Sequence, residues 1–402
     1  MTPRRILLIG SNYRPEPVGI GPYTAGLAEG LVGRGHAVTV VTGQPHYPEW
    51  RISDGYGGRT SSLERGVQVV RCPHYVPFRP RAAKRIAHYA SFARAAYRPS
   101  VAVARSFSPD CVVAVLPSLL NIHTARRAAR TADAHLWAHI QDFEVEAAFA
   151  TDLLSDRLAS PALTYEGRQL RRAGTISTIS PQMRARLIAK DVPRSRVVEL
   201  RNWANHVAAI SASEGRTVRM RHDVGERTMV LYSGSIARKQ GFDTLIEAAR
   251  RLEGREDLVF MVRAPEAGRL AWEQDAPGNM LFGDLVPDDE IGEFLKAADV
   301  HVLPQKAQAA DLVLPSKLSN MLASGRPVVA TAAPGTGLAE EIEGCGIATP
   351  PGDPEALASA IASLTDPAMR RKLGIEAERR ATQRWTLEAV LDAFEARLAE
   401  VL

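Results

Sequence analysis

Short apolar, β-branched runs alternate with segments of helical periodicity along almost the whole chain. RRILLIG at residues 4–10 and HAVTVVTG at 36–43 predict buried strands, and helical patterns stand at 21–35 and 242–254. Strands that alternate with helices are typical of parallel α/β sheets. The other runs predicted as strands lie at residues 67–72, 110–116, 134–140, 175–180, 196–200, 228–235, 257–264, 279–284, 299–304, 326–332 and 346–350.

The alternation lapses in the polar, small-residue stretch RNWANHVAAISASEG at residues 201–215 and then restarts. We therefore predict two doubly wound, Rossmann-like domains at residues 1–205 and 206–386, with a last helical segment at about 387–402 that crosses back to the first. Ligands of open α/β sheets bind beyond the carboxyl ends of the strands, and two facing domains make a cleft for them.

Composition limits the class of protein. The chain has 402 residues, of which 45% are hydrophobic, and its three cysteines form no CxxC pair. Neither a disulfide framework nor a zinc site is supported by the cysteines, so a reducing cytosol fits best. The apolar run near the start is too short for a signal peptide, and no other run approaches the ~20 residues of a spanning helix. We expect a protein that does not cross a membrane.

Positive charge is concentrated in one region. The net charge is only +5, but residues 65–109 contain nine arginines and lysines and no acidic residue. A local excess of this kind indicates an anionic partner. On a helical projection of residues 78–105, the basic residues Lys84, Arg94 and Arg98 lie opposite an apolar face, and Arg85 flanks the edge of that face. The apolar face consists of Ile86, Tyr89, Phe92, Ala93 and Tyr97. This pattern predicts an interfacial membrane helix, and a helix packed on its own domain is the alternative.

The loop after the first strand is rich in glycine. In GSNYRPEPVGIGPY, Gly19 and Gly21 stand just before a helix, where backbone N–H groups can face an anion. A G-x-G-x-x-G directly after the strand is absent, which disfavours a nicotinamide-dependent dehydrogenase. An ordinary glycine-rich turn is the competing interpretation.

A second group follows the strand at residues 134–140. WAHIQDFEVEAAF places His139, Asp142, Glu144 and Glu146 near its carboxyl end, where sites are built in such sheets. Of these, His139, Asp142 and Glu144 form the one cluster in the sequence that we consider for a divalent cation. A structural histidine with satisfied ring nitrogens is the alternative for His139.

Cations follow glycine in LYSGSIARKQG, where Gly234 ends a strand and Arg238 and Lys239 lie in the loop. Two cations on a strand-to-helix loop suit a diphosphate, and a solvated loop pair is the alternative. In VLPSKLSNMLASG, Pro315 predicts a helix start that places Ser316 and Lys317 in the first turn. A lysine is unfavourable there unless an anion neutralises it.

The order of glycine loop, mid-chain histidine, GSIARKQG and PSKLSNMLASGRPVVA resembles family 4 of the retaining glycosyltransferases over essentially the whole chain. Within that family, PSKLSNMLASG together with NYRPEPVGIGPY is most similar to transferases of colanic-acid and O-antigen assembly, including L-fucosamine transferases.

This resemblance implies the glycosyltransferase-B fold, with a nucleotide sugar held mostly by the C-terminal domain. No metal is implied, because cationic side chains and helix N-termini neutralise the diphosphate. It implies that His139, Lys239 and Lys317 are the catalytic residues, with His139 near the reacting sugar. The residues implied for donor binding are Gly19, Ile20, Gly21, Asp142, Gly234, Ser235, Arg238, Arg263, Asp311, Leu314, Pro315, Ser316 and Asn320.

Two positions depart from the family pattern. The family usually has an arginine directly after the glycine that corresponds to Gly234, and this chain has Ser235 there. Arg238 or Arg263 is then left to substitute for that arginine. The E-x7-E pair is missing, because its second position is Asn320 and its first falls near Asp311 or Leu312. An amide at 320 can still bond a ribose hydroxyl.

We therefore predict a retaining, metal-independent glycosyltransferase without a cofactor. It moves a sugar, such as N-acetyl-L-fucosamine, from a nucleoside diphosphate, in our prediction UDP, to a polyprenyl diphosphate-linked saccharide. We expect it to be cytoplasmic and peripheral on the inner membrane, to meet acceptor or membrane through Lys84, Arg85, Tyr89, Phe92, Arg94 and Arg98, and to bind no nucleic acid. Two alternatives stay open: a nucleotide-sugar 2-epimerase, and a non-catalytic nucleotide-sugar-binding partner of another transferase.

Overall fold

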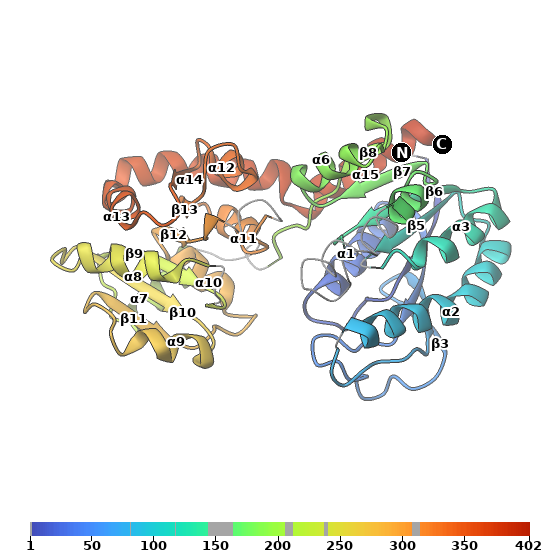
Figure 1. The fold of residues 1–402 in the computed structure, drawn as a ribbon, viewed down its shortest axis with the longest axis horizontal. Helices are drawn as coiled ribbons and strands as arrows, with labels where there is room; N and C mark the ends of the chain where they lie inside the picture. Colours follow the sequence, from blue (N-terminus) through green and yellow to red (C-terminus); the bar gives the residue numbers. More distant parts are fainter. Residues whose placement is uncertain are drawn as a thin grey trace. The chain divides into compact units, whose positions relative to one another are not determined.

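The computed structural model describes residues 2–80, 82–116, 118–143, 164–205, 212–236, 240–307 and 314–402. These residues form two compact units (Figure 1). The first unit comprises Met1–Arg201 and Val390–Leu402, and the second comprises Asn202–Ala389. The division after Arg201 lies within the polar stretch 201–215.

The first unit is built on one eight-stranded sheet with the order β3-β4-β2-β1-β5-β6-β7-β8. All neighbouring strands are parallel except β3 and β4. The strands are β1 (Arg5–Gly10), β2 (Ala37–Gly43), β3 (Thr60–Glu64), β4 (Val67–Cys72), β5 (Cys111–Leu116), β6 (His135–Ile140), β7 (Thr175–Thr178) and β8 (Val197–Glu199). The helices are α1 (Ile20–Gly33), α2 (Ala82–Phe107), α3 (Asn121–Ala132), α6 (Pro181–Ala189), the short 3-10 helix η1 (Arg194–Arg196) and most of α15 (Leu387–Val401).

The second unit contains a six-stranded parallel sheet with the order β11-β10-β9-β12-β13-β14. Its strands are β9 (Thr228–Ser233), β10 (Leu258–Arg263), β11 (Met280–Gly283), β12 (Val300–Leu303), β13 (Val328–Thr331) and β14 (Gly346–Thr349). Its helices are α7 (Ala212–Arg221), α8 (Phe242–Arg251), α9 (Glu266–Glu273), α10 (Ile291–Ala297), α11 (Leu318–Ala323), α12 (Gly337–Ile342), α13 (Pro354–Ser363) and α14 (Pro367–Arg384).

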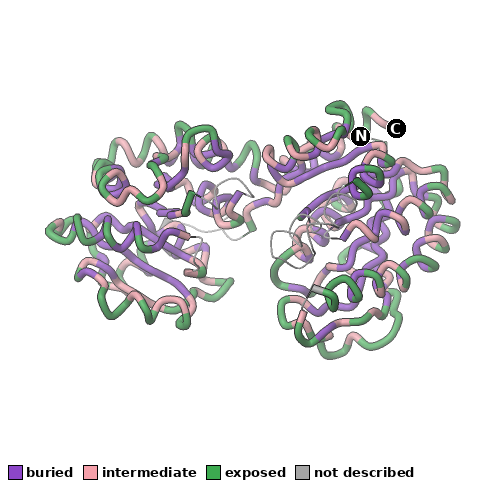
Figure 2. Tube along the Cα trace, viewed as in Figure 1, coloured by how far each residue is buried: buried purple, intermediate pink, exposed green. Residues whose placement is uncertain are grey.

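Burial explains why the strands read as unbroken apolar runs. Every residue of β5, β9 and β10 is buried, as expected for parallel strands covered on both faces. Figure 2 shows the buried positions concentrated in the sheets, while the helices keep exposed outer faces. The prediction of two doubly wound α/β domains is confirmed, and each run predicted as a strand contains one.

The one described strand that the sequence pattern missed is β3. Its residues are TSSLE, and its single large apolar side chain, Leu63, is 72% exposed. An exposed antiparallel edge strand has no apolar face to bury, so hydrophobic periodicity does not reveal it.

The last helix, α15, packs on the first unit. The Phe394 ring stacks on Trp137 with centroids 4.5 Å apart. Leu391 packs directly on Gly30, because a Cβ added to Gly30 would lie 2.7 Å from Cδ1 of Leu391. Arg34 also forms ion pairs with two carboxylates of α15, those of Asp392 at 2.6 Å and Glu395 at 2.5 Å.

The structure corrects the interpretation of the basic helix, α2. Tyr89 and Phe92, predicted to face a membrane, are 8% and 0% exposed and belong to the protein interior. Phe92 is part of the core of the first unit, so this face of the helix is covered by protein. Ile86 and Tyr97 on the same projected face remain 51% and 44% exposed. A helical projection finds an apolar face, but it does not tell whether protein or lipid covers it.

Candidate functional site

Lys317 reaches the carboxyl end of strand β9 in the second unit. Its Nζ donates a hydrogen bond to the Ser233 carbonyl at 3.0 Å and lies 4.7 Å from the centroid of the Tyr232 ring. Gly234, the next residue, has a φ of +129°, and a Cβ on it would lie 2.7 Å from Nζ. The glycine therefore makes room for the lysine.

Burial lowers the pKa of Lys317 to about 8, because desolvation disfavours the ammonium form. No ion pair joins Lys317 to a carboxylate within the described residues. A desolvated cation without a counter-ion is unfavourable, and a bound anion would remove that cost. The position therefore suits an anionic ligand.

Arg263 is a second cation, at the carboxyl end of strand β10. It pairs in register with Ser233, whose carbonyl accepts from Lys317, so the two cations belong to adjacent strand ends. The Arg263 side chain is 9% exposed, and burial lowers its pKa. Its Nη2 lies 3.0 Å from Nδ1 of His222, and its guanidinium lies 5.0 Å from the Phe294 ring centroid.

The Arg263 guanidinium needs the glycine of the neighbouring strand. A Cβ on Gly283 would come within 1.7 Å of its Nη1. In the described part of the chain Arg263 forms no ion pair, and its Nε has no hydrogen-bond partner. Neither His222 nor Phe294 was singled out from the sequence, because no spacing pattern links them to residue 263.

The predicted start of the helix after Pro315 is too early in the chain, so Ser316 and Lys317 do not lie in its first turn. Helix α11 begins at Leu318, with Lys317 at its N-cap, and Pro315 and Ser316 lie before it. The Pro315 carbonyl accepts from the Leu318 N–H at 3.0 Å, so the proline opens a turn that leads into the helix. Leu314 is buried, whereas Ser316 is exposed. Lys317 therefore reaches Ser233 with its side chain from the helix cap.

Asn320, considered for a ribose contact, bonds the segment that enters the second unit. Its Oδ1 accepts from the Asn205 N–H at 3.1 Å, and its Nδ2 lies 3.4 Å from Asn205 Oδ1. Ser235 is exposed, and its carbonyl accepts from the Tyr232 hydroxyl at 2.7 Å.

In the first unit, the glycine loop is packed against the loop that follows β2. Gly19 caps α1 with a φ of +75°, and a Cβ on it would lie 3.0 Å from the Tyr47 ring. A Cβ on Gly21 would lie 2.9 Å from Cβ of Glu16. Ile20 is the first residue of α1. These glycines permit close backbone packing, and they leave the first turn of α1 without a side-chain cap.

Glu16 is a buried carboxylate that the sequence reading did not single out. It accepts hydrogen bonds from the backbone N–H groups of His46 at 3.0 Å and Tyr47 at 3.2 Å, and from Asn12 at 2.9 Å. Burial nevertheless raises its pKa to about 7. Glu16 thus joins the loop after β1 to the loop after β2.

His139 lies at the end of β6 with both ring nitrogens engaged. Nδ1 lies 2.8 Å from Ser177 Oγ, and Nε2 lies 2.8 Å from Nε2 of Gln141. Burial lowers the pKa of His139 to about 4, so the ring is neutral. In this conformation its contacts are those of a structural histidine. Asp142, two residues after the strand, is exposed.

Several predicted site residues lie outside the described residues: Arg238, Lys239 and Asp311, and with them Glu144 and Glu146. The structure therefore places Lys317, Gly234 and Arg263 near two adjacent strand ends, without the loop cations of residues 238 and 239.

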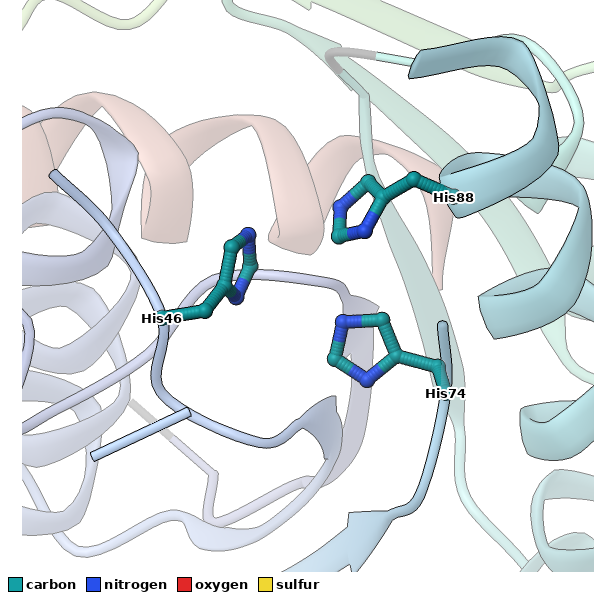
Figure 3. A group of neighbouring side chains, drawn as sticks. All are labelled: His46, His74 and His88. Atoms are coloured by element: carbon teal, nitrogen blue, oxygen red, sulfur yellow. The ribbon is translucent and has the colours of Figure 1, made fainter. Parts of the chain in front are cut away.

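Three histidines of the first unit converge, and the sequence reading did not find them. His46, His74 and His88 each point one ring nitrogen toward a common centre, and these nitrogens lie within 4.8 Å of one another (Figure 3). Their positions in the sequence follow no ligand spacing. Strand pairing brings them together, because β2 and β4 are neighbours and α2 follows β4.

The basic residues proposed for membrane or acceptor contact, Lys84, Arg85, Arg94 and Arg98, are exposed on α2. Near them, Phe78 is 78% exposed and Tyr75 is 46% exposed. Among the described residues, none of the helices combines the length and the apolar character needed to span a bilayer.

Both units match known domain families. Residues 18–203 match the Glycosyl transferase 4-like domain, and residues 227–366 match the Glycosyl transferases group 1 domain. WcaI of Escherichia coli (strain K12), named as a colanic acid biosynthesis glycosyl transferase, is 35% identical over 372 residues, covering 89% of this chain and 91% of that protein. The alpha-D-kanosaminyltransferase of Streptomyces kanamyceticus is 24% identical over 250 residues, covering 60% and 64%.

Solved structures share the fold over the full length. Sucrose-phosphate synthase from Thermosynechococcus elongatus superposes with a TM-score of 0.71 at 19% identity, covering 99% of each chain. HepE of Anabaena, in complex with UDP and glucose, gives a TM-score of 0.65 at 16% identity, covering 99% of this chain and 100% of HepE. The chain belongs to the family 4 glycosyltransferases and has the glycosyltransferase-B fold.

Proposed function

We propose that this enzyme is a retaining glycosyltransferase that uses a nucleoside diphosphate sugar, UDP-linked, as donor and a lipid-linked saccharide as acceptor. The observation that carries the donor proposal is Lys317, a desolvated ammonium at the carboxyl end of β9. It donates a hydrogen bond to the Ser233 carbonyl and makes a cation–π contact with the Tyr232 ring. A diphosphate would supply a counter-ion, which Lys317 does not find among the described residues.

The second cation supports the same assignment. Arg263 stands at the end of the neighbouring strand, buried and without an ion pair among the described residues. Cations fixed before the reaction stabilise charge that develops on a leaving diphosphate, and low polarity around them strengthens the effect. Lys239 would add a third cation through its match to the family motif.

No metal is required in this proposal, because lysine and arginine side chains neutralise the leaving group. Retention follows from attack on the same face that the diphosphate leaves, with a leaving-phosphate oxygen accepting the proton of the acceptor hydroxyl. His139 then shapes the sugar pocket through its bonds to Ser177 and Gln141, and it forms no covalent intermediate.

The acceptor proposal rests on sequence likeness and on surface chemistry. WcaI is named for colanic acid biosynthesis, a polysaccharide pathway, and the motif likeness extends to O-antigen transferases. On this basis we assign an N-acetylated amino sugar as the transferred group and a polyprenyl diphosphate-linked saccharide as the acceptor. The exposed cations of α2 would attract its phosphates and the cytoplasmic face of the inner membrane.

The test is turnover by the purified single chain. UDP-, GDP- and dTDP-sugars are incubated with a polyprenyl diphosphate-linked saccharide, and the product is analysed by mass spectrometry and by NMR of its new anomeric centre. We expect a UDP-sugar to be consumed only with acceptor present and its anomeric configuration to be kept. An epimerised donor in reactions without acceptor would instead identify a 2-epimerase, and inversion would exclude the retaining mechanism.

A further inference from the structure

Three segments of the first unit bring a histidine each to one point. His46 lies in the loop after β2, His74 follows β4, and His88 is on α2 (Figure 3). His46 is 2% exposed and His88 is 1% exposed. One nitrogen of each ring lies within 4.8 Å of those of the other two.

The hydrogen bonds of these rings leave the same nitrogen available. Nδ1 of His46 lies 2.9 Å from the Gln44 carbonyl, and Nδ1 of His88 lies 2.7 Å from the Tyr75 carbonyl. An N–H at Nδ1 that donates to a carbonyl leaves the Nε2 lone pair free. Histidines that bind metals are usually held in this way, with the second nitrogen bonded to a carbonyl or carboxylate.

His74 completes the set. Its Nδ1 lies 3.3 Å from the Cys72 carbonyl and 3.4 Å from the Gln44 backbone nitrogen, which are both long contacts. Its Nε2 is buried and has no hydrogen-bond partner among the residues that the structure describes. A buried polar atom without a partner is unfavourable, so this nitrogen indicates a missing ligand.

We propose that His46, His74 and His88 bind one divalent transition metal of the zinc type through Nε2, with a fourth position open to water or a substrate group. Imidazole is a preferred ligand of zinc, and three protein ligands with an open position form a common zinc centre. Tetrahedral ligands at 2.0–2.1 Å from zinc stand about 3.4 Å apart, so each ring would move inward by about 1 Å.

The surroundings support a metal. Glu16 Oε1 lies 3.3 Å from Nδ1 of His46, so a buried carboxylate stands behind one ligand. Trp50 packs at 5.6 Å from the His46 ring and 5.3 Å from the His88 ring, and Phe92 lies 5.7 Å from the His74 ring. Aromatic neighbours lower the polarity around the histidines and favour the neutral rings that a metal needs.

The metal would join three segments at the carboxyl edge of the first sheet: the loop after β2, the segment after β4 and the start of α2. Its ligands all belong to the first unit, whereas the residues proposed for the diphosphate belong to the second. The inference therefore does not depend on the proposed donor chemistry.

The experiment uses the full chain without a histidine tag. The protein is treated with chelator, desalted and titrated with Zn²⁺ and with Co²⁺, whose visible spectrum reports tetrahedral coordination. The variants are His74→Gln and His88→Gln, with His123→Gln as the control, because His123 lies on α3 and contacts Tyr165 rather than this cluster.

Wild type and His123→Gln should each take up one equivalent of Co²⁺ with tetrahedral bands, and Zn²⁺ should raise their unfolding temperature. His74→Gln and His88→Gln should lose affinity by about a hundredfold or more. If these variants fail to fold, the wild-type Co²⁺ spectrum decides the matter. Wild type without stoichiometric Co²⁺ binding, or folded variants that bind as wild type does, would overturn the proposal.

Discussion

A methyl group on Gly234 would lie 2.7 Å from Nζ of Lys317, the same atom that donates to the Ser233 carbonyl at 3.0 Å. The glycine and the lysine therefore share one small space at the end of β9. We predict that Gly234→Ala moves the ammonium and weakens donor binding by about tenfold or more, the value of a charge-assisted hydrogen bond.

The measurement is the dissociation constant of the donor by calorimetry, together with the unfolding temperature. Gly254→Ala is the matched control, because a Cβ at Gly254 in the same unit meets no atom within 4 Å. Equal donor affinity in Gly234→Ala and wild type would show that the Lys317 position does not matter for the donor.

Strand and helix periodicity was enough to predict the two sheets, because buried parallel strands leave a strong apolar signal. The loops were predicted less well. Pro315 is a good first-turn residue, yet here it opens a turn, and α11 starts at Leu318. Whether a proline begins the helix or the turn before it depends on tertiary contacts such as the bond from Lys317 to Ser233.

The histidine cluster could not be predicted from spacing, since His46, His74 and His88 come from three segments joined only by the order of strands in the sheet. In the same way, the residue pattern of α2 left two interpretations open, a membrane-facing helix and a helix packed on its own domain, and the burial of Tyr89 and Phe92 decides for the second at these positions. The histidine cluster and the burial of these two aromatic residues both depend on which element packs on which face, and a pattern of residues in one segment does not indicate this.

Stability should fall with acid because neutral histidines are buried in both units. Burial lowers the pKa of His139 to about 4 and that of His301 to about 3, each from 6.5. The unfolded chain takes up these protons first, so the stability present above pH 6.5 is lost as the pH falls, toward about 4 for His139 and about 3 for His301. The loss is about 1.4 kcal/mol per pH unit for each histidine within its window.

Urea unfolding across this range measures the slope. His139→Gln should give a shallower pH dependence than wild type for the first unit, whatever its absolute stability. An unchanged slope would mean that His139 is protonated in the folded protein or exposed.

Donor transfer should need neither Mg²⁺ nor Mn²⁺, because the proposed counter-ions of the diphosphate are side chains. Desalted enzyme should show full turnover without either ion, and adding them should change the rate by less than about twofold. That is well below the tenfold change that about 1.4 kcal/mol of activation free energy produces. Stimulation by tenfold would contradict the metal-independent mechanism. Zinc is kept in the buffer, so the histidine site stays unchanged.

Vesicle binding should depend on the cations of α2. Each basic residue near an anionic surface adds about 1 kcal/mol, so replacing Lys84, Arg85, Arg94 and Arg98 by glutamine should weaken binding to phosphatidylglycerol vesicles by more than tenfold. The control replaces Arg371 and Lys372, an exposed basic pair of α14, by glutamine. If wild type does not sediment with vesicles at low salt, or the α2 variant sediments equally, α2 is a packed helix without a membrane role.

If Lys317 binds the diphosphate, its low pKa makes donor affinity depend on pH. With a pKa of about 8, the free enzyme loses the ammonium as the pH rises above that value. Donor affinity should therefore fall above about pH 8 in wild type. Lys317→Met keeps the length and apolar stem but carries no charge, so it should show no such fall.

The most direct measurement compares UDP with UMP on wild type and Lys317→Met by calorimetry at neutral pH, with both proteins shown to be folded. The two nucleotides differ by the phosphate that Lys317 is proposed to bind. Wild type should prefer UDP by about tenfold or more, and this preference should largely disappear in Lys317→Met. An equal preference for UDP in both proteins would contradict the assignment of Lys317 to the diphosphate.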